Sequence, residues 1–390
     1  MRKQHWLCAA LILSFAVNVM AQEYTSRQEV LQNEELRQDF TLQGEYLAEV
    51  EGFKVGVHLI ADGDKKFRVV AYPGGLPGDG WKAGQPRLLG TAEVNGEEIA
   101  FKMTEGRGNV ANVEIKMPEK IDAKGKIVIE RPLGGQGGGQ GGGGQGGGQG
   151  GGAGQFRGTP VKIEVSASGE MPDLTLEKQF RQSPTLNARA PEGAVVIFDG
   201  TNLDQFLPGA KMNEPVARGQ AQGQNRGQQR RNANTLWAEA ATKPFEKKPY
   251  KMHIEFMLSY MPKAKGQGRA NSGVYIDERY ELQVLDSFGL EGENNECGGF
   301  YTMAKPLVNM CFPPLTWQTY DIEFTPAKYD GDKKTANARV TVKHNGVLIH
   351  DNVELKQGTP GRKEEGPAPL GLYLQGHGNK VQYRNIWIQY

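Results

Sequence analysis

The sequence predicts an all-β protein with two domains. Short runs rich in Val, Ile, Tyr and Phe recur along its 390 residues between Gly, Asn and Asp turns, and long helical periodicity is nearly absent. About 370 residues after a leader also exceed the usual length of one domain. We therefore expect a smaller β-rich domain over residues 22–181, a polar linker over residues 182–193, and a two-sheet sandwich over residues 194–390.

Residues 1–21 have the pattern of a signal peptide. Arg2 and Lys3 make a basic start, residues 7–19 are mostly apolar, and the Val-Met-Ala that ends at Ala21 is typical of a cleavage site. The apolar run is too short and too interrupted to predict a membrane span. We expect an exported protein, periplasmic or secreted.

The charge balance of the chain bears on its binding partners, and its cysteine content bears on disulfide bonds. Without the leader's two basic residues, the 46 Lys and Arg of the chain nearly balance its 45 Asp and Glu. Nucleic acid is therefore not the expected partner, because phosphate binding needs a net basic face. Cys297 and Cys311 remain after the leader, and an oxidising compartment allows either a disulfide or two separate thiols.

The N-terminal domain begins with one expected short helix at residues 26–37. Residues 134–154 are almost pure Gly and Gln, and such a segment holds no side chain able to build a core. Strand-like runs flank it, so we expect an expanded hairpin loop within the domain. The expected strands lie at residues 44–50, 54–61, 67–72, 90–94, 98–103, 112–116, 126–130 and 161–166.

The C-terminal domain has the strongest strand pattern. Asn345-Gly346 predicts a tight hairpin turn, and residues 214–234, rich in Gln, Arg, Asn and Gly, predict a disordered loop. The expected strands lie at residues 195–198, 251–259, 273–276, 280–285, 299–301, 319–324, 338–344, 347–350, 371–375 and 382–388.

Polar residues alternate with the apolar ones on three of these strands. Glu255, Glu281 with Gln283, and Gln375 occupy the outward positions. If these strands are neighbours in one curved sheet, their outward faces form a groove, with His377 at its rim. The outer face of any sandwich is polar because it is wet, so only the convergence of several such groups would indicate a sugar site.

Aromatic rings stack on the C–H faces of sugars, and Tyr275, Tyr301, Trp317 and Tyr373 are the candidates. Metal sites have little support, because no two His stand at ligand spacing and the cysteines form no CxxC pair. No metal or other cofactor is predicted with certainty, although a divalent cation such as Ca²⁺, held by Asp and backbone oxygens, is compatible with such a sandwich. The sequence has no nucleophilic-serine elbow.

Eight segments carry a family resemblance. In chain order they are VVIFDGTNLDQF, HIEFML, NSGVYI, YELQVLDS, CGGFY, PPLTWQTYDIEF, ARVTVKHNGVLIHD and GHGNKVQYRNIWI. As a set they resemble the 3-keto-disaccharide hydrolase domain family, whose fold is a concanavalin-like jelly-roll sandwich. The resemblance implies cleavage of glycosides already oxidised to a ketone at C3. A base removes the C2 proton, the C1 substituent leaves by elimination, and water addition completes a net hydrolysis.

The strand over residues 281–286 is also similar to the E-x-D-x-x-E strand of laminarinase-type glycosidases. Gln283 stands where that strand has its central Asp, and Asp286 stands where it has its second Glu. Retaining hydrolysis depends on the separation of the two carboxylates. This departure therefore favours elimination.

The resemblance implies roles for individual residues. Glu281 is expected to be the general base or a metal ligand, Glu255 the next acid, and His377 an acid or a ligand. The residues expected to bind the carbohydrate substrate are Asn271, Tyr275, Gln283, Asp286, Tyr301, Trp317, Gln375 and Arg384. The alternative is a non-catalytic carbohydrate-binding module of the cell surface.

Overall fold

The computed structural model describes residues 21–50, 52–107, 121–129, 160–167, 173–213 and 234–390. Three segments singled out in the sequence lie outside the described residues: the signal peptide except Ala21, the Gly/Gln insert, and the Arg/Gln-rich loop except Asn234. The strand expected at residues 112–116 also lies outside them. Within the described part of the chain, no helix combines the length and apolar character needed to span a membrane.

Two short helices, α1 (Arg27–Gln32) and α2 (Glu34–Leu42), stand where the sequence predicted one. Asn33 divides them. Its extended backbone ends α1, and its side-chain oxygen then accepts hydrogen bonds from the N–H groups of Glu35 and Leu36. An Asn in this position caps the start of the second helix, so the chain turns instead of continuing as one helix.

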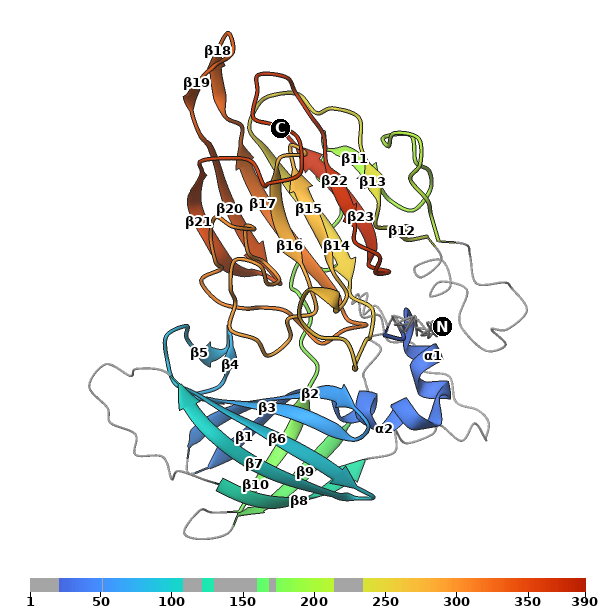
Figure 1. Cartoon of the computed structure of the whole chain (residues 1–390), viewed down its shortest axis with the longest axis vertical. Coiled ribbons are helices and arrows are strands. Elements are labelled where there is room, and N and C mark those ends of the chain that lie inside the picture. The colour runs from blue at the N-terminus through green and yellow to red at the C-terminus, as the bar shows by residue number, and fades with distance from the viewer. Residues whose placement is uncertain (1–20, 51, 108–120, 130–159, 168–172, 214–233) are drawn as a thin grey trace, which may run out of the picture.

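Eight antiparallel strands close the N-terminal domain into a barrel, at the bottom of Figure 1. β1 pairs with both β2 and β10, which closes the ring. Two very short strands, β4 (Leu76–Pro77) and β5 (Gly80–Trp81), lie in the Gly- and Pro-rich loop after β3. The barrel strands are β1 (Gly44–Val50), β2 (Phe53–Gly63), β3 (Lys66–Pro73), β6 (Arg87–Asn95), β7 (Glu98–Arg107), β8 (Ile121–Ile129), β9 (Val161–Ala167) and β10 (Leu174–Gln179).

The C-terminal domain consists of two antiparallel sheets, which confirms the predicted all-β sandwich. The large sheet has the order β11 (Val195–Phe198), β23 (Gln382–Gln389), β14 (Tyr250–Met257), β17 (Trp317–Thr325), β20 (Ala338–His344) and β21 (Val347–Leu355), and β12 (Leu236–Trp237) also pairs with β23. The small sheet has the order β13 (Ala240–Ala241), β22 (Tyr373–Gly376), β15 (Ser272–Ile276) and β16 (Tyr280–Val284). A small hairpin of β18 (Lys328–Asp330) and β19 (Lys333–Ala336) completes the domain.

The core lies between the two sheets. Ile254 and Phe256 of β14 belong to the same buried cluster as Val274 of β15 and Leu282 of β16. These are the inward positions that strand alternation predicted. The turn between β20 and β21 also follows the prediction, because both Asn345 and Gly346 have positive φ, at 50° and 81°.

The barrel packs against one end of the sandwich. The ring of His58 stacks on that of Phe288, with 4.4 Å between centroids. Arg87 of the barrel forms an ion pair with Glu291 and donates to the carbonyl of Leu290 at 3.1 Å. The two domains therefore share a specific interface, to which both stacked rings and charged groups contribute.

Candidate active site

The site is built on the hairpin of β15 and β16. Tyr275 pairs with Glu281, and Gly273 pairs with Gln283. The tight turn between the strands has left-handed backbone at Asp277 and Glu278, with φ of 53° and 46°. Two successive positive φ values match the twist of the flanking strands. The sequence predicted strands at residues 273–276 and 280–285, and the structure pairs these two strands as the hairpin.

A continuous row of polar and aromatic side chains lies on the outer face of the small sheet. Alternation along each strand turns these residues away from the core, and Tyr275 also pairs with Tyr373 of the neighbouring strand β22. We call this set the Glu281 row. It consists of Asn271, Tyr275, Glu281, Gln283, Tyr373 and Gln375, together with Gly273, which pairs with Gln283 and Gln375.

Glu281 is the ionisable centre of the row. It is only 4% exposed, and it shares a hydrogen bond with Tyr275. Burial raises the pKa of Glu281 to about 7, while the Tyr275 hydroxyl and the Arg362 guanidinium limit that rise. A carboxyl group with a pKa near neutrality exchanges protons readily at physiological pH, which is what a general base or acid requires.

Arg362 reaches the row from the loop between β21 and β22. Its guanidinium carbon lies 3.6 Å from the ring centroid of Tyr373 and 5.3 Å from that of Tyr275. Its Nη2 lies 3.4 Å from Oε2 of Glu278. Sequence reasoning missed Arg362, because an irregular Gly- and Pro-rich loop has no periodicity that would point its side chains anywhere.

Gln267, in the 3₁₀ turn η1 (Gly266–Gly268), was also missed. Its carbonyl accepts from Nδ2 of Asn271 at 2.8 Å, and its side-chain oxygen lies 3.5 Å from Nε2 of Gln283. Gln267 thus joins two of the three amide side chains of the row, those of Asn271 and Gln283. Only the folded loop brings it there.

Among the residues that the structure describes, three buried polar atoms at this site have no hydrogen-bond partner: Oδ1 of Asn271, Oε1 of Gln375 and Nε of Arg362. The other ends of the two amides are held, since Nε2 of Gln375 donates to the Tyr275 hydroxyl at 3.3 Å and Nδ2 of Asn271 to Gln267. Buried polar atoms are rarely left unpaired, and each one needs an explanation. Two free acceptors and one donor beside a titratable carboxyl group are suited to hydroxyl and carbonyl groups of a ligand.

Two further predicted residues lie at the margins of the row. The N–H of Tyr301 donates to the carbonyl of Glu281 at 3.2 Å, and a bridge between Leu282 and Phe300 extends the sheet edge there. His377 is exposed in the turn after β22. Asn379 ties that turn to the row by accepting from the N–H of Asn271 at 2.8 Å.

Asp286 does not belong to the row, contrary to its expected role in binding sugar. Its carboxylate accepts from Nε of Arg269 at 2.6 Å, and the side chains are 1% and 3% exposed. The chain has left β16 at this point and turned toward the barrel. Asp286 therefore neutralises a buried arginine at the domain interface.

The expectation that Glu255 and Glu281 lie on neighbouring strands of one sheet is wrong. Glu255 is on β14, which pairs with β17 and β23 in the large sheet. Its outward face is therefore on the opposite side of the sandwich. Arg384 and Trp317 lie there too: Nε of Arg384 donates to Glu255 at 2.6 Å, and its guanidinium lies 4.0 Å from the Trp317 ring centroid.

Residues of the predicted linker cover this second cluster. Thr185 donates to Asp321 at 2.6 Å, and the N–H of Asn187 donates to Glu255. His253 lies beneath them, 2.6 Å from Asp321 and 3.4 Å from Glu255. Burial opposes its charge, but these two carboxylates raise the pKa of His253 to about 9. The charged groups neutralise one another under the linker, so we interpret the cluster as structural.

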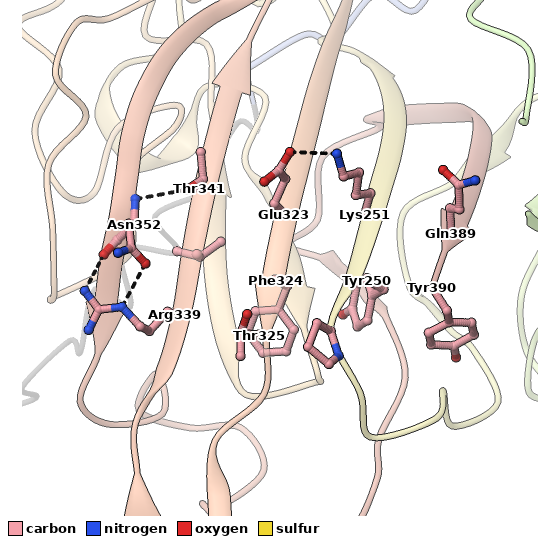
Figure 2. A pocket seen from close by; sticks show the side chains of 12 residues that line it. Tyr250, Lys251, Glu323, Phe324, Thr325, Arg339, Thr341, Asn352, Gln389 and Tyr390 are labelled. Carbon is pink, nitrogen blue, oxygen red and sulfur yellow. Dashed lines mark hydrogen bonds and ion pairs between the residues drawn. The ribbon is translucent and has the colours of Figure 1, made fainter.

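A separate hollow of about 360 Å³ lies on the outer face of the large sheet, farther along the strands that carry Glu255 and Asp321 (Figure 2). Its charged and polar side chains pair with one another. Lys251 lies 3.1 Å from Glu323, and Arg339 makes two 2.8 Å hydrogen bonds to Asn352. Because the carboxylate that lines this hollow, Glu323, is exposed and paired with Lys251, we place the candidate active site at the Glu281 row.

Cys297 and Cys311 are both buried, and both are free thiols. They lie within hydrogen-bond reach of each other, and Sγ of Cys297 is 3.2 Å from the Tyr320 hydroxyl. Of the two arrangements that the sequence allowed, the structure contains separate thiols.

The described residues contain no group of three or more His, Cys, Asp or Glu side chains that could hold a metal ion. At the Glu281 row the carboxylate stands beside amides, phenols and one guanidinium. Carboxylate and amide oxygens are ligands that hard divalent cations accept, whereas a guanidinium opposes a second positive charge.

Comparison with known proteins adds a family match. A family model of the 3-keto-alpha-glucoside-1,2-lyase-like domain matches residues 193–389. A search of curated proteins found no match.

Solved structures give weaker likenesses. Two crystal structures described as a "putative glycosyl hydrolase" from Parabacteroides distasonis are 27% and 17% identical, with TM-scores of 0.40 and 0.26. They cover 51% and 52% of this chain, and 84% and 91% of their own. Trypanosoma rangeli sialidase is 7% identical with a TM-score of 0.27, over 88% of this chain and 59% of its own. With TM-scores this low, the assignment rests on the family match.

Proposed function

The chain belongs to the 3-keto-alpha-glucoside-1,2-lyase-like family through residues 193–389, and on that premise we propose that it cleaves glycosides whose sugar carries a ketone at C3. Membership makes it a glycoside-acting enzyme. The 3-keto substrate and the elimination mechanism are the proposal.

One observation carries this proposal. Glu281, a buried carboxyl group whose pKa is raised to about 7, lies among the unpartnered polar atoms of Asn271, Gln375 and Arg362. The reaction needs one weak base near C2 and hydrogen-bonding groups that orient the sugar and its ketone. A site with one titratable carboxyl group is sufficient for it.

The first step is removal of the C2 proton. A ketone at C3 makes this proton acidic, and the Glu281 carboxylate accepts it. The electrons of the C2–H bond form an enolate whose negative charge lies on the C3 oxygen. Arg362, the nearby cation, stabilises this charge, because a fixed positive group acts most strongly where charge develops in a site shielded from water.

The second step expels the C1 substituent. The enolate reforms the C3 carbonyl, a C1–C2 double bond forms, and the glycosidic C–O bond breaks. The leaving oxygen takes a proton from an acid, for which the newly protonated Glu281 and the rim residue His377 are the candidates. Addition of water across the double bond then gives the products of hydrolysis.

The position of Asp286 supports elimination over double displacement. A retaining glycosidase needs two carboxyl groups about 5 Å apart on either side of the scissile bond. Asp286 follows Glu281 on the strand, but it is buried in its pair with Arg269. It is therefore not available as the second catalytic carboxylate.

Incubating the protein with 3-keto-trehalose or an aryl 3-keto-glucoside, with the unoxidised glucoside as control, tests the proposal. We expect release of the aglycone from the keto sugar alone, and slower release when C2 carries deuterium. Glu281→Gln should abolish release. No turnover across such substrates, with or without added divalent metals, would overturn the proposal.

The same assay distinguishes the enzyme hypothesis from the alternative, a non-catalytic carbohydrate-binding module. A binding module would retain glycan affinity in the Glu281→Gln variant and would form no product with either protein. Calorimetric titration of both proteins with the keto sugar measures this difference.

We also propose that the protein acts outside the cytoplasm, on the basis of its basic and apolar N-terminus and the Val-Met-Ala before Gln22. N-terminal sequencing of protein recovered from the expressing cells should give a chain that begins at Gln22. A chain that begins at Met1 would contradict export by this route.

A further inference from the structure

We propose that the barrel domain positions one end of the Glu281 row through Arg269, and is therefore part of how the site is built. The kinetic consequences of this inference rest on the proposed function. Its structural consequence does not.

Arg269 is a sandwich residue with its donors directed to both domains. Its Nη1 and Nη2 lie 3.4 Å and 3.3 Å from the carbonyl of Ala61, on barrel strand β2. Its Nη1 also donates to the carbonyls of Pro262 and Ala264, at 3.0 Å and 3.3 Å. With Asp286 on Nε, the guanidinium is held on all sides, and its side chain is 3% exposed.

The residues next to Arg269 enter the active site. Gln267 precedes it by two positions, and Asn271 follows it by two. Ala270, between Arg269 and Asn271, is fully buried and has a φ of 49°. A left-handed backbone costs a non-glycine residue about 1 kcal/mol or more, and such a conformation persists only where its surroundings hold it. The hydrogen bonds and ion pair of Arg269 fix the chain on one side of Ala270 and so help to keep this conformation.

One contact between the domains lies away from this segment. Arg87 joins the barrel to Leu290 and Glu291, beyond the end of β16. Arg87 is also a buried arginine, with 7% side-chain exposure, and it also combines an ion pair with a carbonyl contact across the interface. It is therefore a matched control for Arg269.

Arg269→Lys and Arg87→Lys, each in the full chain, form the first test. Lysine retains the charge but lacks the planar fork, so it cannot serve Asp286 and the three carbonyls together. We expect Arg269→Lys to lower kcat/KM at least tenfold and Arg87→Lys to change it less than twofold. Combined with Asn271→Ala, Arg269→Lys should have a smaller effect than it has alone, because both changes act on the same group.

Hydrogen exchange provides a readout that needs no turnover. The N–H groups of Arg269 and Asn271 are bonded, at 3.1 Å to the carbonyl of Gly266 and at 2.8 Å to Asn379. We expect exchange over residues 266–271 to become at least tenfold faster in Arg269→Lys and to stay unchanged in Arg87→Lys. If the wild-type protein turns over no keto sugar, the proposed function fails while exchange still decides this inference.

A barrel-side change keeps the test usable if Arg269→Lys does not fold. Asp62, next to Ala61, has Oδ1 3.9 Å from Nη1 of Arg269. Asp62→Asn should accelerate exchange over the same residues to a smaller degree. Unchanged exchange in both Arg269→Lys and Asp62→Asn, or equal effects of Arg269→Lys and Arg87→Lys on exchange, would overturn the inference.

Discussion

The carboxylate of Glu281 occupies the space that a side chain on Gly273 would need. A β-carbon at Gly273 would lie 2.4 Å from Oε1 of Glu281 and 3.0 Å from its Cγ. The two residues are diagonal neighbours on the paired strands β15 and β16. Because nothing but a hydrogen fits at Gly273, glycine there lets the carboxylate fold back over the hairpin beside Tyr275.

Gly273→Ala should therefore displace the catalytic carboxylate without unfolding the domain. The clash is with the end of a flexible side chain, so Glu281 moves and the backbone stays. A displacement near 1 Å in a catalytic group costs about 100-fold in rate. We expect that loss in kcat/KM, measured on a 3-keto-glucoside, with little change in melting temperature.

Gly268→Ala is the matched control for that variant. Gly268 lies in the neighbouring 3₁₀ turn, and a β-carbon there would meet nothing within 4 Å. Its kcat/KM should stay within twofold of wild type. Full activity in Gly273→Ala would show that the position of the Glu281 carboxylate does not matter.

The pH dependence of kcat/KM should report Glu281. The carboxylate is the active form of a base, and burial raises the pKa of Glu281 to about 7. We expect kcat/KM to rise with pH and to level off above about 7. His253→Gln, on the far face, should keep this profile, whereas a profile already flat from pH 5 upward would exclude Glu281 as the base.

Glu281 should also make the protein less stable at alkaline pH. Because its folded-state pKa of about 7 lies above the ordinary value of a glutamate side chain, about 4.3, the folded protein binds this proton more tightly than the unfolded chain. Stability is therefore lost as pH rises from about 4.5 through 7, by up to about 3 kcal/mol.

Glu281→Gln removes that cost, because an amide is never charged. Urea unfolding should show the variant to be more stable than wild type at pH 8 and about equally stable at pH 4. A variant less stable than wild type at pH 8 would contradict the raised pKa.

Arg362 should affect both kcat and the pH at which kcat/KM rises. Its charge lowers the pKa of Glu281, so Arg362→Met should move the limb of the kcat/KM profile upward by about one unit. The same variant loses the cation that stabilises the enolate, and we expect a 10- to 100-fold fall in kcat. Arg339 lies in the hollow of Figure 2, and Arg339→Met should alter neither quantity. If the pH profile of kcat/KM is unchanged in Arg362→Met, Arg362 does not act on Glu281.

Glu255→Gln should affect stability and spare catalysis. Glu255 is fully buried against Arg384 and His253, and removing one partner leaves buried charges unbalanced, at a cost of about 3 kcal/mol. We expect that loss in urea unfolding, with kcat/KM of the folded protein within twofold. Lost activity at unchanged stability would restore the catalytic role that the sequence predicted for Glu255.

Local patterns predicted whatever depends on residues close together in the chain. The alternation in β14, β15 and β16 gave the correct inner face of each strand, because side chains of a strand point to opposite sides by geometry. The Asn345-Gly346 turn was predictable because both positions need a positive φ that Asn and Gly tolerate. Neither inference needed knowledge of which strands are neighbours.

Long-range pairing was not predictable in the same way. Glu255 and Glu281 have equivalent outward positions on their strands, and no local pattern assigns β14 to one sheet and β16 to the other. Arg362 and Gln267 come from loops, where no period fixes the direction of a side chain. The same holds for Asp286, whose partner Arg269 lies 17 positions earlier in the chain.

The sequence alone determined an all-β chain, a family resemblance that the family model bears out, and a strand that carries Glu281, because these depend on composition, spacing and motif order. Only the tertiary structure decided which polar residues meet. It separated Glu255, Trp317 and Arg384 from Glu281, and it brought Arg362 and Gln267 in. The physical reason is that burial, and with it the raised pKa of Glu281, depends on strands and loops that pack together from distant parts of the chain.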